Sequence, residues 1–205
     1  VMLVASFETE EDANDALAQL AALDPPRPGR LEFVIGDAWR DGWRAHFKPT
    51  RIGTRLVVRP SWEPFEAAPS DVVLTIDPGR AFGTGTHETT RLVLSEIDAR
   101  VHGGETVLDV GAGTGILAVA ALLFGARSAL CIDNDADTVG VVVETAERNA
   151  VAKRLVAGTT PIEDVGGAYD LVLANIEARV LIPLAGAIAA RVAPGGTLVL
   201  SGLLV

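Results

Sequence analysis

The chain has 205 residues, a formal net charge of −10 at pH 7 and 49% hydrophobic residues. That length allows one full domain and a smaller one, and the negative charge argues against general binding to nucleic acid or to anionic membranes. No apolar run approaches the roughly 18 residues that a membrane span needs, so we expect no membrane association. A single cysteine, Cys131, excludes an internal disulfide and favours the reducing cytoplasm.

The first sixty residues predict a small domain of short strands and helices. Thr9 followed by Asp12 resembles a capping box at the start of a helix. Trp39, Trp43 and Phe47 recur every four residues and so share one face of a second helix. The patterns predict strands at 1–7, 31–35 and 55–59 and helices at 9–21 and 37–47. We therefore expect a small α/β (α+β) domain over residues 1–59.

A proline-rich stretch separates this domain from the rest of the chain. Pro60, Pro64 and Pro69 alternate with polar residues, which is typical of a stiff connector. The sequence therefore predicts a linker over residues 60–70 and a second domain over residues 71–205.

Strands alternate with longer helices from Val72 onwards. The expected strands are 72–76, 106–110, 128–132, 154–157, 170–174 and 197–201. The expected helices are one that ends near Ala99 and those at 115–124, 135–149 and 178–191. Near-continuous apolar strands in such an alternation indicate a parallel sheet with helices on both faces. Ligands bind such sheets outside the carboxyl ends of the strands, where the strand order reverses.

A glycine loop follows the strand at 106–110. It reads Asp109-Val-Gly111-Ala-Gly113-Thr-Gly115-Ile116. A dinucleotide-binding fingerprint would need glycine at Ile116, and no phosphate-binding Gly-Lys-Ser/Thr run is present. The loop resembles motif I of the class I S-adenosylmethionine-dependent methyltransferases, which implies cofactor contacts by Asp109, Gly111 and Gly113. A glycine turn with only a structural role is the alternative.

Polar residues follow two strands of the predicted sheet. Asp133 follows the strand at 128–132, where a carboxylate is well placed to accept both ribose hydroxyls of a ligand. It could instead cap the next helix, as could Asp135 or Asp137. Asn175 follows the strand at 170–174, and its amide carbonyl could orient a substrate amine; a turn or cap role is the alternative. Cys131 is expected in the core.

The segment 77–90 contains glycines, hydroxyl residues and a histidine. Thr89 or Thr90 could cap the following helix or hydrogen-bond a cofactor. His87 could bind substrate or accept a proton, although a lone histidine is structural about as often. No Cys/His cluster has the spacing of a zinc site, so we expect no metal.

Four motifs together carry a more specific resemblance. They are Asp77-Pro-Gly-Arg-Ala-Phe82-Gly83-Thr84-Gly-Thr-His87-Glu-Thr89-Thr90, the glycine loop, Ala174-Asn175-Ile176, and Gly195-Gly196-Thr-Leu-Val-Leu-Ser201-Gly202. The combination closely resembles the ribosomal protein L-eleven methyltransferase family. The stretch from Trp39 to Pro49 is similar to that family's junction between its substrate-recognition and catalytic domains.

The resemblance implies a Rossmann-like class I methyltransferase sheet and S-adenosylmethionine as cofactor. It implies methylation of lysine ε-amines and of the N-terminal α-amine of that large-subunit ribosomal protein. Asn175 and His87 are the residues that we expect to act on the substrate. Cofactor contacts are implied for Thr90, Gly111, Asp133 and Asn175. Phe82, Gly83 and Thr84 would close over the site.

The sequence departs from the family pattern at Ala112 and Thr114 in the glycine loop. It also stops just after the predicted strand at 197–201, so we expect the C-terminal hairpin to be absent and one sheet edge to be uncovered. Three alternatives remain: another protein-lysine or amine N-methyltransferase, a catalytically weak S-adenosylmethionine-binding regulator, and an NAD-dependent oxidoreductase, which Ile116 disfavours. We expect a monomer without direct contacts to nucleic acid.

Overall fold

The computed structural model describes residues 9–23, 47–77 and 87–202. The chain divides into two compact units, Val1–His46 and Phe47–Val205. The described part of the first unit is α1 (Glu10–Ala21), in which the Thr9 side chain accepts a hydrogen bond from the backbone N–H of Asp12. This confirms the predicted start of that helix. The strands expected at 1–7 and 31–35, and residues 37–46 of the second expected helix, lie outside the described residues.

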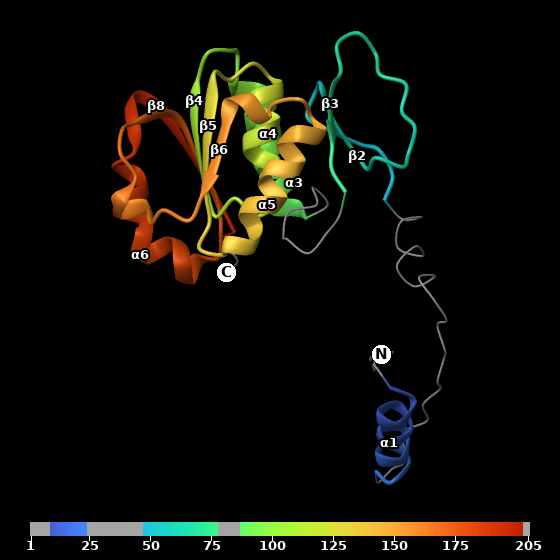
Figure 1. Cartoon of the computed structure of the whole chain (residues 1–205). Coiled ribbons are helices and arrows are strands. Elements are labelled where there is room, and N and C mark those ends of the chain that lie inside the picture. Colours follow the sequence, from blue (N-terminus) through green and yellow to red (C-terminus); the bar gives the residue numbers. More distant parts are fainter. Residues whose placement is uncertain (1–8, 24–46, 78–86, 203–205) are drawn as a thin grey trace. The chain divides into compact units, whose positions relative to one another are not determined.

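The second unit is built on a parallel sheet of five strands in the order β6-β5-β4-β7-β8 (Figure 1). The strands are β4 (Thr106–Val110), β5 (Ser128–Ile132), β6 (Leu155–Gly158), β7 (Tyr169–Asn175) and β8 (Val192–Ser201). Every neighbouring pair is parallel, which confirms the predicted parallel sheet. The chain adds β5 and β6 on one side of β4 and then β7 and β8 on the other. The strand order therefore reverses beside β4.

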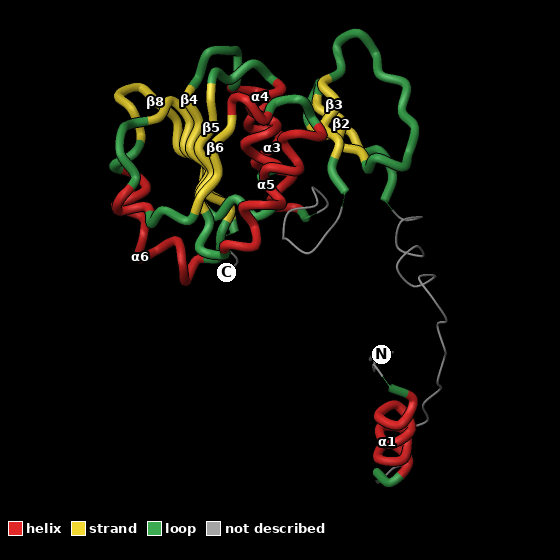
Figure 2. Tube along the Cα trace, viewed as in Figure 1, coloured by secondary structure: helices red, strands yellow, loops and turns green. Residues whose placement is uncertain are grey.

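Helices cover both faces of this sheet. Figures 1 and 2 show α3 (Glu88–Arg100), α4 (Ile116–Leu123) and α5 (Ala136–Arg148) on one face and α6 (Ala178–Ala189) on the other. Side chains alternate between the two faces along a strand. On β4, Val107 packs into the core of α3, α4 and α5, whereas Leu108 and Val110 pack into the core of α6. Two short 3₁₀ helices, η2 (Ala152–Arg154) and η3 (Ile162–Asp164), flank β6.

A second, smaller sheet lies in the same unit. It consists of β1 (Thr50–Ile52), β2 (Leu56–Arg59) and β3 (Val72–Thr75), with β1 antiparallel and β3 parallel to β2. Leu56 and Leu74 are fully buried in the core that contains α3 and α4. Because β2 pairs with β3 across the predicted linker at 60–70, residues 47–59 belong to the second unit. The division therefore falls at His46/Phe47 and not at the proline-rich stretch.

One buried carboxylate fixes the turn between β1 and β2 to α3. The Asp98 carboxylate accepts hydrogen bonds from the backbone N–H and hydroxyl of Thr54 and from the backbone N–H and Nε of Arg55. A Cβ at Gly53, whose φ is +68°, would lie 2.6 Å from Asp98 Oδ2. The Arg55 guanidinium lies 4.6 Å from the centroid of the Phe124 ring, a cation–π contact. The small sheet is thus anchored by charge as well as by packing.

The predicted elements of the second unit agree with the structure apart from their ends. β8 begins at Val192, earlier than the expected 197, because Gly195 adopts a φ of +79° and a register shift between Tyr169 and Leu171 lets pairing continue. β1 and the two 3₁₀ helices lacked a pattern strong enough to predict. Among the described helices, none combines the length and apolar character needed to traverse a bilayer.

Candidate active site

The glycine loop connects the end of β4 to α4. Gly111, Gly113 and Gly115 have φ values of +71°, +54° and +73°, in the left-handed region that glycine adopts without steric cost. The Gly111 N–H donates to the carbonyl of Ile132 at the end of β5, at 2.8 Å. A Cβ at Gly115 would lie 2.9 Å from Val142 Cγ1. The loop therefore needs glycine for its turn and for its close packing on neighbouring elements.

Asp109 lies beneath this loop with no exposed surface. Its Oδ2 accepts a hydrogen bond from the backbone N–H of Ala118 at 3.1 Å, in the first turn of α4. Since Gly115 at the N-cap offers no side chain, Asp109 takes over the capping of that helix. Its Oδ1 has no hydrogen-bond partner among the described residues.

Burial raises the pKa of the Asp109 carboxyl to about 7, with the hydrogen bond from Ala118 acting against the rise and the negative charge of Asp133 adding to it. Burial also raises the pKa of the Cys131 thiol, and the charge of Asp109, its register partner on β4, adds to the rise. The expectation that Cys131 is a core residue is confirmed, because it is 1% exposed. The cofactor contact expected of Asp109 stays a prediction; its visible role is to hold the start of α4.

Asp133 joins the end of β5 to the glycine loop. Its Oδ2 accepts a hydrogen bond from the backbone N–H of Gly113 at 2.9 Å, and its Oδ1 accepts one from Asp135 at 3.1 Å. The N-cap of α5 is Asp135, whose side chain accepts from the backbone N–H of Asp137. Of the three aspartates that could cap this helix, the structure selects Asp135 and leaves Asp133 on the loop.

Asn175 and Thr90 meet although they are 85 residues apart in sequence. The Asn175 Nδ2 donates to the Thr90 Oγ1 at 3.2 Å. Thr90 lies in the first turn of α3 and is 1% exposed. The nitrogen and oxygen of an amide lie in one plane at a fixed angle to each other, so this bond also sets the direction of the Asn175 carbonyl oxygen.

His87 is the N-cap residue of α3. Its Nδ1 accepts a hydrogen bond from the backbone N–H of Thr89 at 3.3 Å and lies 2.7 Å from the Thr89 Oγ1. The sequence suggested Thr89 or Thr90 as the cap of this helix, but the structure shows that His87 caps it. The expected role of His87 toward substrate stays a prediction. Phe82, Gly83 and Thr84 lie outside the described residues.

Asn149 makes a contact between α5 and β3 that sequence reasoning missed. It follows α5, and its side chain accepts from the backbone N–H of Thr75 at 2.8 Å and donates to the Thr75 carbonyl at 2.7 Å. Next to it, Arg148 lies 3.4 Å from the Asp77 carboxylate. These contacts span more than seventy residues of sequence. No local pattern could have signalled them.

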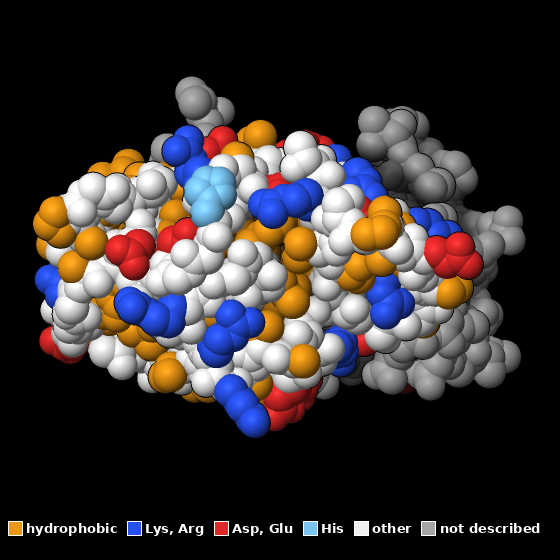
Figure 3. Space-filling view, turned by 90° about the horizontal axis from the view of Figure 1, so that it is seen from above, with side chains coloured by type: hydrophobic (Ala, Val, Ile, Leu, Met, Phe, Trp, Pro, Cys, Tyr) orange, Lys and Arg blue, Asp and Glu red, His pale blue; other side chains and the backbone are white. Residues whose placement is uncertain are grey.

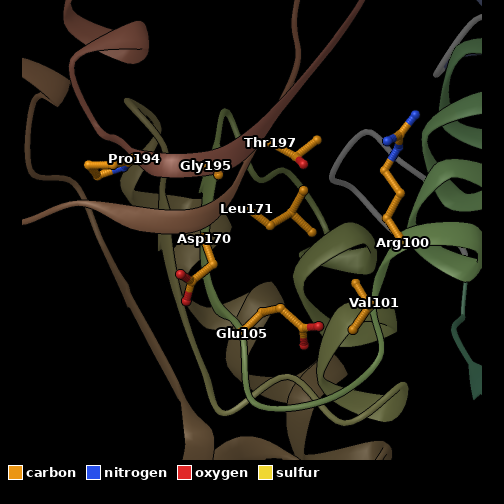
Figure 4. Close-up of a pocket in the computed structure, with 9 residues that line it drawn as sticks. Arg100, Val101, Glu105, Asp170, Leu171, Pro194, Gly195 and Thr197 are labelled. Carbon is orange, nitrogen blue, oxygen red and sulfur yellow. The ribbon is translucent and has the colours of Figure 1, made fainter.

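A pocket lies at the other end of the sheet, where the strands begin (Figure 4). It is formed by Arg100 and Val101 at the end of α3, Glu105, Asp170 and the first half of β8. None of the predicted site residues lines it, so it is not the expected cofactor site. In the space-filling view of Figure 3, the Lys and Arg side chains are scattered, and several of them lie beside Asp or Glu side chains. The face in that view therefore carries no continuous basic patch.

Comparison with known proteins adds the family. The family model described as ribosomal protein L11 methyltransferase (PrmA) matches residues 1–205. The chain is 49% identical over 210 residues to the ribosomal protein L11 methyltransferase of Sorangium cellulosum and 49% identical over 180 residues to that of Geobacter metallireducens. These matches cover 100% and 88% of this chain but 65% and 59% of the two relatives. The chain thus spans about three fifths of the length of these relatives.

A solved structure supports the same assignment. The crystal structure of ribosomal protein L11 methylase from Lactobacillus delbrueckii subsp. bulgaricus is similar, with a TM-score of 0.69 and 32% identity. The match covers 76% of this chain and 80% of that chain. The predicted Rossmann-like methyltransferase fold is confirmed. By its sequence over the full 205 residues, this chain belongs to the ribosomal protein L11 methyltransferase (PrmA) family.

Proposed function

We propose that this chain transfers methyl groups from S-adenosylmethionine to lysine ε-amines and to the N-terminal α-amine of ribosomal protein L11. Family membership supports the reaction, and one structural observation supports the site. The hydrogen bond between Asn175 and Thr90 holds an amide at the carboxyl end of β7, the strand next to β4 and its glycine loop.

The described residues fit this cofactor. Gly111 and Gly113 present backbone without side chains, which suits close approach by the amino-acid part of the cofactor. The Asp133 carboxylate, held by Gly113, has remaining lone pairs for two ribose hydroxyls. When bound, the cofactor supplies a methyl group made electrophilic by a positively charged sulfur.

Asn175 acts on the substrate amine. Its carbonyl oxygen accepts a hydrogen bond from an amine N–H, which leaves the nitrogen lone pair directed toward the methyl group. The main contribution of the protein to this reaction is to align the amine nitrogen with the methyl group.

The substrate amine must be neutral before it reacts. Exclusion of water from the site lowers the pKa of a lysine ammonium group. The ammonium group therefore loses its proton to the surrounding water as the lysine enters the site. His87 remains a second candidate for accepting that proton, and its Nδ1 already accepts from the Thr89 N–H.

Labelled S-adenosylmethionine tests the proposal directly. The wild-type chain is incubated with the labelled cofactor and an extract of bacterial ribosomal proteins, and cofactor binding is measured in parallel by calorimetry. We expect label in ribosomal protein L11. Label in other proteins alone would indicate another protein-lysine methyltransferase, and binding without label in any protein would indicate a regulator. Binding of NAD in place of S-adenosylmethionine would indicate an oxidoreductase.

We further propose that the protein acts as a monomer in the cytoplasm, where ribosomal proteins are made. The buried Cys131 thiol suits a reducing compartment. Light scattering at several concentrations tests the oligomeric state: a constant monomer mass supports this part of the proposal, and a concentration-dependent dimer mass contradicts it.

A further inference from the structure

Ile176, the residue after Asn175, lies between two glycines from different parts of the chain. A Cβ at Gly111 would lie 2.2 Å from Ile176 Cγ2. A Cβ at Gly202 would lie 2.3 Å from the Ile176 carbonyl oxygen and 2.7 Å from its carbonyl carbon. Each distance is far inside van der Waals contact. Ile176 can occupy its position only because both neighbours lack a side chain.

The two glycines belong to the strands on either side of β7. Gly111 directly follows β4, Gly202 directly follows β8, and both strands pair with β7. Both glycines adopt left-handed φ values, +71° and +85°. The carboxyl ends of three adjacent strands therefore meet at Ile176.

Asn175 is held on two sides by this arrangement. Its backbone pairs with Ser201 of β8, the residue before Gly202, and its side chain donates to Thr90. Ile176 is joined to Asn175 by a peptide bond. A shift of the Ile176 backbone would therefore move Asn175 and turn its side-chain amide away from Thr90.

We propose that Ile176 and Gly202 are positioning residues for Asn175: the close contact of Gly202 on the Ile176 backbone sets the direction of the Asn175 amide and thereby the rate of methyl transfer. This inference rests on the proposed function, in which Asn175 orients the substrate amine. It assigns to Gly202 a role in the transfer step, because the atoms nearest to a Cβ at Gly202 all belong to the backbone of Ile176, the residue next to Asn175.

The test compares Gly202→Ala with Gly167→Ala. Gly167 has nearly the same φ, +81°, but a Cβ there would meet nothing within 4 Å, and it precedes β7 at the amino end of the strand. Both variants place alanine in a left-handed conformation, and only Gly202→Ala pushes on Ile176. The measurements are kcat and KM for ribosomal protein L11 and the dissociation constant for S-adenosylmethionine.

We expect kcat of Gly202→Ala to fall about a hundredfold, the scale of a 1 Å misplacement of a reacting group. Its cofactor dissociation constant should change less than about threefold, about 0.7 kcal/mol, and Gly167→Ala should keep kcat within about twofold, about 0.4 kcal/mol. Equal losses of kcat in the two variants contradict the inference. So does a loss of cofactor affinity in Gly202→Ala as large as its loss of kcat.

A second variant covers the case in which Gly202→Ala does not fold. Ile176→Ala removes the side chain that faces Gly111, and Ile182→Ala on α6, 70% exposed, is its control. We expect kcat to fall about tenfold, about 1.4 kcal/mol, in the first variant only. Unchanged kcat in Ile176→Ala contradicts the inference.

A measurement without turnover separates this inference from the proposed function. The Asn175 side-chain amide signal is identified in an NMR spectrum by its loss in Asn175→Ala. We expect the signal to move in Ile176→Ala and Gly202→Ala and to stay in place in Gly167→Ala, even if the wild-type chain methylates no protein. An unmoved signal in both of the first two variants overturns the positioning role, whereas an absence of methylation with a moved signal overturns only the function.

Discussion

The Asp133 carboxylate accepts a hydrogen bond from the backbone N–H of Gly113 at 2.9 Å. This contact joins the end of β5 to the loop that follows β4, two strands that are neighbours in the sheet. A side chain with the chemistry to bind a ribose is thus oriented by the loop proposed to hold the amino-acid part of the same cofactor. One hydrogen bond therefore joins the two halves of the proposed cofactor site.

Replacement of Asp133 by alanine should weaken S-adenosylmethionine binding at least about tenfold, or about 1.4 kcal/mol. The reason is the loss of the ribose acceptor together with its hold on Gly113. Calorimetry measures the effect. The matched control is Asp135→Ala, which removes the α5 cap and should cost about 1 kcal/mol of stability with little change in affinity. Unchanged affinity in Asp133→Ala would remove the ribose assignment.

The Asn175–Thr90 hydrogen bond predicts a coupling in a double-mutant cycle. Asn175→Ala should lower kcat about a hundredfold, and Thr90→Val, which removes the acceptor of the amide N–H, about tenfold. The double variant should be no slower than Asn175→Ala, because Thr90 acts through Asn175.

Thr145→Val is the control for the Thr90 variant, since Thr145 is also a buried hydroxyl but bonds to its own helix. Its kcat should stay near the wild-type value. Losses that simply multiply in the Asn175 and Thr90 double variant would show that the two residues act independently.

Much of this site was predictable from sequence because it lies where strands end. A buried strand, a glycine run and an acid after the next strand are local patterns, and parallel pairing brings strand ends together at one edge of a sheet. This reasoning predicted that Asp133, Asn175 and the glycine loop lie at the ends of their strands, and they do. What the sequence could not show was that Thr90, and not Thr89, reaches Asn175, because that choice depends on how α3 packs.

Asp98→Ala should destabilise the second unit by about 3 kcal/mol. It leaves the Thr54 and Arg55 donors around a buried, empty position. Chemical denaturation measures the loss, with Glu96→Ala as the control, since its ion pair with Arg100 is exposed and should contribute about 0.5 kcal/mol. Similar losses in the two variants would contradict the anchoring role.

The same carboxylate predicts a pH dependence in acid. Burial acts to raise the pKa of Asp98, but hydrogen bonds from Arg55 and Thr54 outweigh it, and the net pKa lies below 3.8. Because the folded-state pKa is depressed, this stabilisation is complete above the unfolded value and is lost as the pH falls through the folded value. Acid unfolding of the wild type below pH 3.8 should therefore be steeper than that of Asp98→Ala. Parallel acid unfolding of the two would contradict this assignment.

The buried Asp109 carboxyl should give the free energy of unfolding the opposite dependence on pH. Its pKa is raised from 3.8 to about 7 in the folded protein, so between these values the folded state retains a proton that the unfolded state releases. The free energy of unfolding should then fall as the pH rises through this window, by at most about 1.4 kcal/mol per pH unit. Asp109→Asn keeps an acceptor for Ala118 and removes the titration. Its stability should be flat over the window relative to the wild type, and identical pH profiles in chemical denaturation would contradict the assignment.

Contacts distant in sequence set the limit of sequence-based prediction here. The boundary at His46/Phe47 follows from β2 pairing with β3 and from Asp98 binding Thr54 and Arg55. The prolines at 60–70 predict a stiff connector, but they do not show that the strands before and after it, β2 and β3, pair with each other. The contact of Asn149 was equally unpredictable, because nothing in the sequence shows that a polar residue after a helix hydrogen-bonds to the backbone of a distant strand.

Mass spectrometry of ribosomal protein L11, incubated with S-adenosylmethionine and this chain, tests the central claim most directly. Wild-type protein should add methyl groups to lysine side chains and to the N-terminal amine, and Asn175→Ala should add them far more slowly while still binding the cofactor. Ribosomal protein L11 that stays unmodified, with wild-type protein that binds S-adenosylmethionine in the same solution, would contradict the proposed function.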